Sequence, residues 1–308
     1  MLFPRLFACC SDWKKTIYFK RQSIFYQDVI ALFIVNHYYH FVYETVLQLY
    51  PLLAYNFFDK YPNATILCFY SNGFTANNFE MLKALKINFP WSDVRRGRRD
   101  RLYTVAEGYT LVITRHNNFH SKEQENVEYN RNLLNLIRGR ITSQPANPDL
   151  FLYVSRQGIR RCIKQEWELY LGLKNIYPNL TFFFPDNHTV ETQKETFAKS
   201  RVIISPHGAS LTNALFSNWE RLTLVELTPM QNPLTYRDNL WVKNHFVLKC
   251  PSVPCSPRRR GDCDAWRLQM DVNVTMAVQV IHEIIQGSDE GKNISMDYII
   301  NASHVKDL

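Results

Sequence analysis

The sequence lacks any apolar stretch long enough to cross a membrane as a helix. The longest uninterrupted apolar run, residues 29–35, has seven residues, whereas a membrane-spanning helix needs about 20. The first residues, MLFPRLFACCSDWKK, also lack the basic, apolar and small-residue order of a signal peptide. We therefore expect no membrane span in this chain and no secretion signal at its start.

Two common site signatures are missing as well. No GxGxxG segment follows an expected strand, which leaves a nucleotide-binding oxidoreductase as a weak alternative. Cys250, Cys255 and Cys263 cluster in a proline-rich segment without a suitably placed histidine, so a zinc site is not indicated. For these cysteines we expect a loop and, in a secretory compartment, a disulfide.

The composition is that of a globular protein, with 46% hydrophobic and 21% charged residues. The net charge of +8 favours an anionic partner, which could be nucleic acid, an acidic membrane or a phosphorylated small molecule. The densest basic runs, residues 95–101 and 258–260, belong to no recognisable nucleic-acid-binding module. We therefore expect solvated loops there and no nucleic-acid partner.

Six asparagines stand in the N-glycosylation acceptor pattern, about twice the number expected by chance. They are Asn63, Asn179, Asn187, Asn273, Asn293 and Asn301. Together with the cysteines, this excess favours the lumen of the secretory pathway, in the endoplasmic reticulum or the Golgi.

Apolar periodicity predicts an α/β protein in two halves. In the first half we expect strands at 24–35, 64–70 and 109–114 and helices at 40–58, 79–85 and 125–138. In the second half we expect strands at 150–154, 180–184, 202–205 and 222–227 and helices at 165–175, 190–198, 210–216 and 274–286. Such alternation indicates parallel sheets built from βαβ units. The proline-containing segment 141–149 is the expected linker, so we predict domains at 1–145 and 146–308.

The segment VIISPHGAS, residues 202–210, has the form of a strand, a tight turn and the start of a helix. At the carboxyl end of a parallel strand, a helix N-terminus favours phosphate binding. Gly208 and Ala209 would let a diphosphate approach the backbone, and His207 can donate a hydrogen bond to it. The alternative is a structural turn in which His207 caps the helix.

Two further elements could complete this site. Glu226 lies in the next strand and could accept hydrogen bonds from a ribose diol; alternatively, it is a buried carboxylate paired with an arginine. Arg156, Arg160 and Arg161 follow the strand that ends at residue 154, and guanidinium groups bind diphosphate oxygens well. If the two strands are neighbours, one or two of these arginines can reach the same anion; otherwise they belong to a solvated loop.

In the first half, His40 and Glu44 are four residues apart and share one face of a predicted helix. Facing a cleft, such a pair could deprotonate an acceptor hydroxyl. It could equally be a helix-capping histidine beside a solvated glutamate.

Four segments in this order resemble glycosyltransferase family 61. They are YYHFVYE at 38–44, SRQGIRR at 155–161, SPHGASLTNALF at 205–216 and LVELTP at 224–229. The resemblance implies a GT-B-like fold, with two doubly wound Rossmann-like domains facing across a cleft. It also implies an inverting transfer of a sugar, GlcNAc or xylose, from a UDP-sugar to a hydroxyl of a protein or glycan, with no cofactor and no obligatory metal.

Position by position, the resemblance distributes the candidate residues over two sides of a cleft. It places Arg156, Arg160, His207, Gly208 and Asn213 at the donor, Glu226 at the nucleotide ribose, and His40 and Glu44 on the acceptor side. Arg161 and Ala209 join the donor site on the chemical grounds above.

The chain differs from the family pattern at Lys164 and Gln165, where Asn-Glu is common, and the segment before His40 is short. We therefore expect the first domain to be N-terminally incomplete. The same departures motivate a second hypothesis, a catalytically inactive relative that binds a glycan or a protein partner in the secretory pathway.

Overall fold

The computed structural model divides into two compact units, residues 1–140 and 141–308, and each is described by itself. The residues that the structure describes are 22–33, 41–46, 59, 64–69, 76–86, 91–92, 101–110, 134–135, 137–139, 147–156, 161–230, 242–254, 268–291, 297–300 and 305–307.

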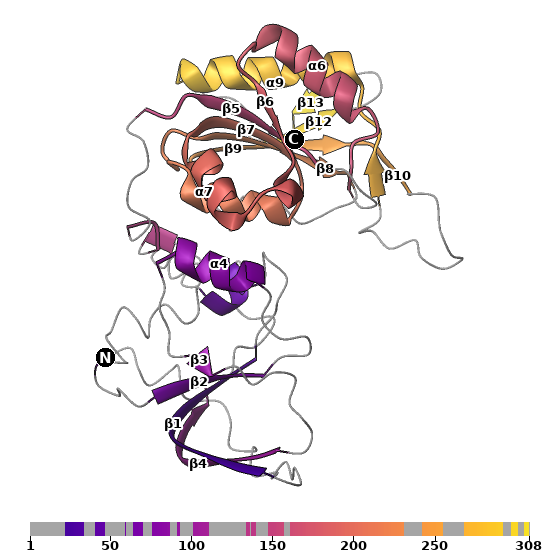
Figure 1. The fold of residues 1–308 in the computed structure, drawn as a ribbon. Helices are drawn as coiled ribbons and strands as arrows, with labels where there is room; N and C mark the ends of the chain where they lie inside the picture. The colour runs from indigo at the N-terminus through magenta and orange to yellow at the C-terminus, as the bar shows by residue number, and fades with distance from the viewer. Residues whose placement is uncertain are drawn as a thin grey trace. The chain divides into compact units, whose positions relative to one another are not determined.

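The first unit contains a four-stranded parallel sheet in the order β3-β2-β1-β4 (Figure 1). Its elements are β1 (Gln22–Phe33), the π-helix η1 (Phe41–Val46), β2 (Ala64–Phe69), α4 (Ala76–Ala84), β3 (Trp91–Ser92) and β4 (Arg101–Thr110). The strand expected at 109–114 therefore begins earlier, at Arg101, where β4 pairs with Gln22 of β1. The long β1 offers a partner to residues that the local pattern assigned to a basic loop.

The helix expected at 40–58 is represented by η1, and residues 47–58 lie outside the described part of the chain. Its turns are wider than those of an α-helix because each hydrogen bond joins residues five apart. Phe41, Val42 and Val46 are fully buried, as the apolar periodicity predicts.

The second unit contains a seven-stranded sheet in the order β13-β12-β9-β8-β7-β5-β6. Its strands are β5 (Leu150–Val154), β6 (Thr181–Phe183), β7 (Ser200–Pro206), β8 (Thr223–Pro229), β9 (Asn244–Cys250), β12 (Asp297–Ile300) and β13 (Val305–Asp307). Its helices are α6 (Glu166–Ile176), η2 (Pro185–Asn187), α7 (Val190–Ala198), η3 (Ala209–Phe216) and α9 (Val274–Asp289). β10 (Ser252–Pro254) and β11 (Leu268–Met270) form a separate antiparallel pair.

All neighbours from β6 to β12 are parallel, and only β13 at the edge of the sheet runs antiparallel. In chain order, the first five strands have the spatial order 2-1-3-4-5 of a doubly wound sheet. The predicted α/β class is therefore confirmed. The facing of two domains across a cleft stays a prediction.

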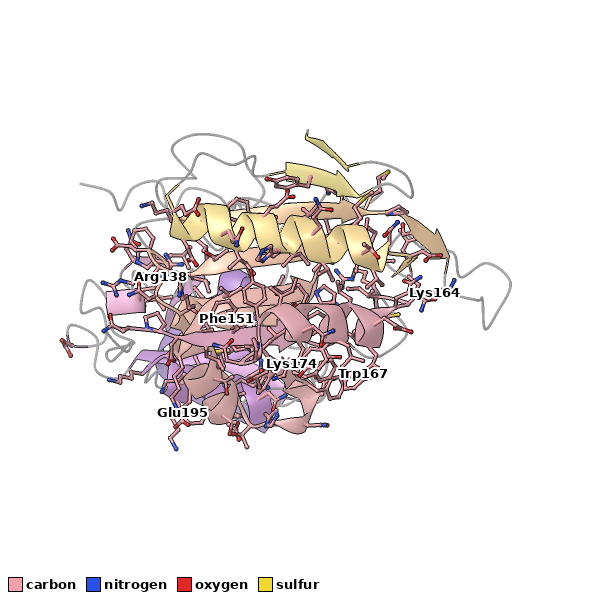
Figure 2. All side chains as sticks on the ribbon, turned by 90° about the horizontal axis from the view of Figure 1, so that it is seen from above. Arg138, Phe151, Lys164, Trp167, Lys174 and Glu195 are labelled. Atoms are coloured by element: carbon pink, nitrogen blue, oxygen red, sulfur yellow. The ribbon has the colours of Figure 1, made fainter. Side chains whose placement is uncertain are left out.

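Helices cover both faces of this sheet, with α6 and α9 on one face and α7 on the other (Figure 1). Seen from above in Figure 2, α9 lies beside α6, which carries Trp167 and Lys174. Strand residues such as Tyr153, Ile204 and Val225 pack with apolar residues of α6 and α9 in one buried cluster. Each fully buried leucine or isoleucine there contributes about 2 kcal/mol.

Local chemistry explains the helix positions. Thr189 caps α7 by accepting a hydrogen bond from Thr192 N at 3.2 Å, and Asn273 caps α9 in the same way through Met276 N at 3.1 Å. Gly172 lets α9 approach α6, because a Cβ atom there would lie 2.8 Å from Cγ2 of Val278.

Most elements predicted in the second half are confirmed, but β9 to β13 were not foreseen. Cys250 is the last residue of β9 and is fully buried with a free thiol. The expectation of a loop disulfide was therefore wrong for Cys250, because β8 provides a partner strand that continues to this residue. Cys255 and Cys263 lie outside the described residues. No helix in the described residues is long and apolar enough to span a membrane.

Candidate functional site

The candidate site lies where the doubly wound sheet changes direction. After β5 the chain turns to α6 on one face, and after β7 it turns to η3, which contacts α7 on the other. Ligands of such sheets bind at the carboxyl ends of the two strands beside this switch point. The segments that follow β5 and β7 begin with Ser155-Arg156 and His207-Gly208, so both sequence motifs meet there.

Strand register places four polar side chains on one face of the sheet. Leu224 pairs with His245 and Ser205 pairs with Glu226, and side chains alternate between faces along each strand. His207, Glu226 and His245 therefore share the face opposite the apolar cluster under α6 and α9. Arg156, two residues beyond the end of β5, joins the same row.

The Arg156 side chain folds directly over the turn that follows β7. Its Nη1 donates a hydrogen bond to the carbonyl oxygen of His207. A Cβ atom on Gly208 would lie 2.0 Å from this Nη1 and 3.0 Å from Cζ of Arg156. Gly208 thus leaves the space that the guanidinium of Arg156 occupies, whereas its φ of −176° is extended and open to any residue. β5 and β7 are neighbours, which meets the condition under which the SR and HGA motifs could share a site; the donor role of Arg156 stays a prediction.

Glu226 is fully buried and is held by two imidazoles. Its Oε1 lies in hydrogen-bond contact with Nδ1 of His207, and its Oε2 is 2.9 Å from Nε2 of His245. Burial raises the pKa of Glu226, but the hydrogen bonds from both histidines outweigh it and lower this pKa to about 2. Glu226 is therefore an ionised acceptor. Its two hydrogen-bond partners seen among the described residues are histidines, and the ribose role stays a prediction.

An ionised carboxylate only accepts hydrogen bonds, so each imidazole must carry a proton on the nitrogen that faces it. The proton is on Nδ1 in His207 and on Nε2 in His245. Burial, followed by the charges of Arg161 and Arg156, lowers the pKa of His207 below its usual value despite the contact with Glu226. At neutral pH His207 is therefore a neutral ring whose Nε2 carries the lone pair.

Arg161 adds positive charge at the end of the SRQGIRR segment. Its φ is 58°, a left-handed conformation that costs a non-glycine residue about 1 kcal/mol. Its backbone N–H donates to Leu268 O at 2.7 Å, so β11 holds this turn. Arg160 lies outside the described residues, and its donor role stays a prediction.

The carboxylate of Glu166 accepts two hydrogen bonds from the SR motif. Ser155 Oγ donates to Oε2 of Glu166 at 2.9 Å, and the backbone N–H of Arg156 donates to Oε1 at 3.1 Å. Glu166 is the first residue of α6 and is mostly buried, and burial raises its pKa despite these two bonds. The start of α6 therefore fixes the backbone from which Arg156 reaches Gly208.

The departure from the family pattern has a local explanation. Gln165 donates from Nε2 to Oδ1 of Asp271 and accepts from Val272 N at 3.0 Å, and Lys164 is 3.4 Å from Asp271 Oδ2. Both residues thus join the start of α6 to the segment before α9. Glu166, one position later, is the acidic residue that contacts the SR motif.

The HGA turn opens into a 3-10 helix rather than the expected α-helix. Gly208 is buried, whereas Ala209 and Ser210 are partly exposed. The first N–H groups of a helix have no partner inside the helix. A ligand would therefore meet the backbone at Ala209 and Ser210.

Asn213 is fully buried in η3. Its Nδ2 donates to Oε1 of Gln193 at 2.7 Å, and Nε2 of Gln193 donates to the carbonyl oxygens of Pro185 and His188 at 2.9 and 3.1 Å. This geometry supports a packing role that ties η3 to α7, and the donor role of Asn213 stays a prediction.

The acceptor-side pair falls largely outside the described residues. His40 is not among them, and only the backbone of Glu44, within η1, is described. Of the six glycosylation candidates, Asn179, Asn187 and Asn273 are described, and all three are exposed.

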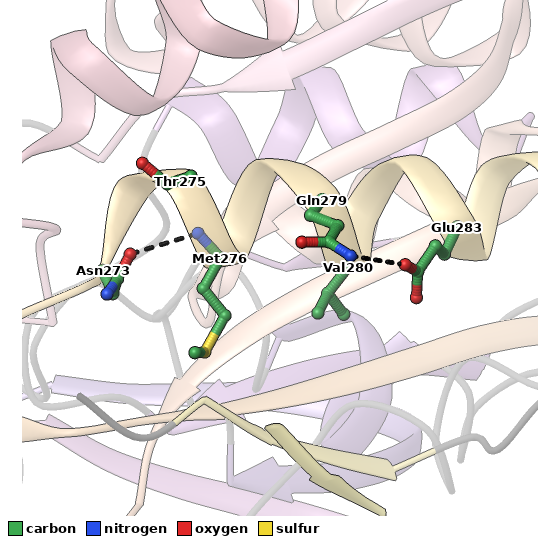
Figure 3. Close-up of a pocket in the computed structure, with 6 residues that line it drawn as sticks. All are labelled: Asn273, Thr275, Met276, Gln279, Val280 and Glu283. Atoms are coloured by element: carbon green, nitrogen blue, oxygen red, sulfur yellow. Dashed lines mark hydrogen bonds between the residues drawn. The ribbon is translucent and has the colours of Figure 1, made fainter. Parts of the chain in front are cut away.

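A cavity of about 350 Å³ lies along α9, and its lining does not include Arg156, His207, Glu226 or His245. Its described lining residues are Asn273, Thr275, Met276, Gln279, Val280 and Glu283 (Figure 3). None of them comes from the SR or HGA segments. The chemistry of the site therefore rests on the side chains at the switch point.

His245 was missed by the sequence reasoning because β9 was not predicted. The signal was present: the segment HFVLKC contains a short apolar run of the kind that forms a buried strand. Within the described residues, no three His, Cys, Asp or Glu side chains are arranged to hold a metal ion. His207 and His245 each bond to Glu226 instead.

Of three comparisons with known proteins, one agrees with the sequence motifs. No match was found among curated proteins. Among solved structures, the metal-soaked Flv1 flavodiiron core from Synechocystis sp. PCC6803 is 13% identical with a TM-score of 0.30, over 86% of this chain and 81% of that chain. A similarity this low carries no argument. The family model described as Glycosyltransferase 61 matches residues 38–225. Because this match spans more than half of the sequence and includes the YYHFVYE, SRQGIRR and HGA segments, the chain belongs to glycosyltransferase family 61.

Proposed function

We propose that this protein is an inverting glycosyltransferase that transfers a sugar from a UDP-sugar to a hydroxyl group of a protein or glycan. The observation that carries the proposal is the position of Arg156 over the His207-Gly208 turn at the switch point of a doubly wound sheet. GlcNAc and xylose are the sugars that we would test first.

The charges around the turn suit a diphosphate. Arg156 and Arg161 carry two positive charges, and the ionised Glu226 behind them carries one negative charge. Among the described residues the balance at the turn is therefore positive, and guanidinium groups bind phosphate oxygens through paired hydrogen bonds. Ala209 and Ser210, which begin η3 and are partly exposed, would supply further backbone N–H donors.

His207 would respond to the bound anion. A negative charge close to an imidazole favours its protonated form and raises its pKa. Proton uptake at Nε2 would then let His207 donate to the diphosphate while Nδ1 continues to donate to Glu226. Together with the arginines, this group would stabilise the departing UDP.

The transfer would be a single in-line displacement. The oxygen of the acceptor attacks the anomeric carbon as the bond from that carbon to the diphosphate breaks, and Glu44 or His40 takes the proton of the attacking hydroxyl. We expect no obligatory metal, so incubation with EDTA should leave turnover unchanged. The exposed Asn179, Asn187 and Asn273 fit a location in the secretory lumen, which we also propose.

The test is a panel of UDP-sugars assayed for hydrolysis, transfer and thermal stabilisation of the protein. We expect at least one donor to raise the melting temperature, and Arg156→Ala to abolish this shift. Arg201→Ala is the matched control because Arg201 lies near the start of β7 and pairs with Asp289. If no UDP-sugar stabilises the protein, or if Arg156→Ala binds as well as wild type, the proposal is wrong.

A further inference from the structure

His245 occupies an unusual position for a polar side chain. It is 1% exposed, and its Nε2 is 2.9 Å from Oε2 of Glu226. Its other ring nitrogen, Nδ1, is buried and has no hydrogen-bond partner among the described residues. Buried polar atoms are nearly always paired, so an unpaired ring nitrogen at this point is unusual. The contact between Nε2 and Glu226 is the only polar interaction of this ring in the described structure that can offset it.

His245, Glu226, His207 and Arg156 form a row of side chains joined by hydrogen bonds. His245 donates to Glu226, Glu226 accepts from Nδ1 of His207, and Arg156 donates to the carbonyl oxygen of His207. Each contact joins neighbouring strands of the sheet or the segments that follow them. His245 is the end of this row farthest from the HGA turn, and among the described residues Glu226 joins it to that turn.

We propose that His245 is a positioning residue for His207. By donating from Nε2 it occupies Oε2 of Glu226 and fixes the carboxylate, so that Oε1 keeps the His207 proton on Nδ1 and leaves the lone pair on Nε2. This inference rests on the proposed function, because it assigns His245 a part in preparing the donor site. His245 itself would not touch the donor.

Several charged and titratable groups surround His207 and influence where its proton lies. Arg156 and Arg161 face it from the SR segment, Glu226 faces it from β8, and His245 stands behind Glu226 on β9. η3, with the sequence ASLTNALF, contributes no titratable group. Without His245, Glu226 would lose the hydrogen bond from Nε2 that holds Oε2, and the carboxylate could rotate or take up a proton.

Two substitutions separate the donor function of His245 from its size. His245→Phe keeps a ring but removes the N–H, whereas His245→Gln retains an amide N–H that can reach Glu226. We expect His245→Phe to lower kcat about 10- to 100-fold, by analogy with the range for partners that orient metal-ligating histidines. The limb of the pH profile that reports His207 should also shift. His245→Gln should restore kcat to within about threefold of wild type.

The second measurement does not depend on transferase activity. In the full chain with ¹⁵N-labelled histidine, the ring signals of His207, assigned by their loss in His207→Asn, should show the proton on Nδ1. The same pattern should persist in His245→Gln and give way to a mixture of tautomers in His245→Phe. Should His245→Phe fail to fold, wild type and His245→Gln still provide the comparison.

The outcomes are distinct. Unchanged His207 signals and an unchanged pH profile in a folded His245→Phe variant would overturn the inference, and so would a wild-type His207 with its proton on Nε2. If wild type transfers no sugar but the tautomers behave as expected, the proposed function fails and the positioning by His245 stands.

Discussion

A Cβ atom on Gly208 would lie 2.0 Å from Nη1 of Arg156. Because alanine adopts the extended backbone of Gly208 without strain, Gly208→Ala should fold normally but push the guanidinium away from the His207 carbonyl oxygen. A hydrogen bond to a charged group contributes about 1.5–3 kcal/mol, so we expect the KM for the donor to rise at least about tenfold. Initial-rate kinetics with the best UDP-sugar measure this.

The matched control for that substitution is Gly139→Ala, because a Cβ atom at Gly139 meets nothing within 4 Å. It should leave both KM and the melting temperature unchanged. A wild-type KM in Gly208→Ala would mean that the position of Arg156 does not matter for donor binding.

Acid should destabilise the protein through Glu226. The carboxyl group has a pKa of about 2 in the folded protein against 4.5 for an unperturbed glutamate, so its contribution to stability is present above about pH 4.5. That contribution, about 3 kcal/mol from the difference in pKa, is lost as the pH falls from about 4.5 towards 2. Urea unfolding at a series of pH values measures it.

In Glu226→Gln this part of the pH dependence should disappear, although the variant should already be less stable at pH 7. His207 adds a separate loss below about pH 6.5, because its lowered pKa means that the fold favours the neutral ring. An equally steep loss between pH 4.5 and 2 in Glu226→Gln would show that other groups cause it.

Asn213 and Gln193, which share a hydrogen bond, should be energetically coupled in a double-mutant cycle. Either substitution removes the 2.7 Å hydrogen bond between the two side chains, so Asn213→Ala and Gln193→Ala should each destabilise the protein by about 1–2 kcal/mol. The double variant should cost less than the sum by about 1 kcal/mol. Additive losses, together with a raised donor KM in Asn213→Ala alone, would favour the donor role predicted from the family motif.

Restoring the family's glutamate at position 165 should not help. Gln165→Glu would place a second carboxylate against Asp271, whose pKa is lowered first by the hydrogen bond from Gln165. We expect a small loss of stability at pH 7, below about 1 kcal/mol because the site is partly exposed, and no gain in turnover. Asp271→Asn in the same background should remove the loss. Higher turnover in Gln165→Glu alone would instead mean that the departure reduces activity.

The sequence predicted those parts of the site that depend on short local patterns of neighbouring residues. The strand and turn around His207 and the helix α7 follow from short periodic patterns, and the family motifs bring Arg156 close to them. Contacts between strands cannot be predicted from local patterns, because they join residues far apart in the sequence. His207 and His245 each lie 19 residues from Glu226, so only the register of β8 and β9 shows that they share one carboxylate.

The same limit explains the errors at the ends of elements. Cys250 was assigned to a loop because prolines follow it, yet its neighbour across the sheet decides its conformation. Arg101 was read as part of a basic loop, although β1 offers it a pairing partner. Long-range pairing overrides local composition in both places.

The strand order 2-1-3-4-5 sets how much of the second unit can open before the site is lost. The polar side chains lie in or directly after four interior strands, β5, β7, β8 and β9. These strands are flanked by β6 on one side and by β12 and β13 on the other. Edge strands open most easily, and central strands exchange their amide hydrogens only in larger openings. Fraying at either edge should therefore leave the row intact, and amide exchange in β7 and β8 should follow global unfolding. Loss of donor binding on heating would then coincide with unfolding of the whole sheet.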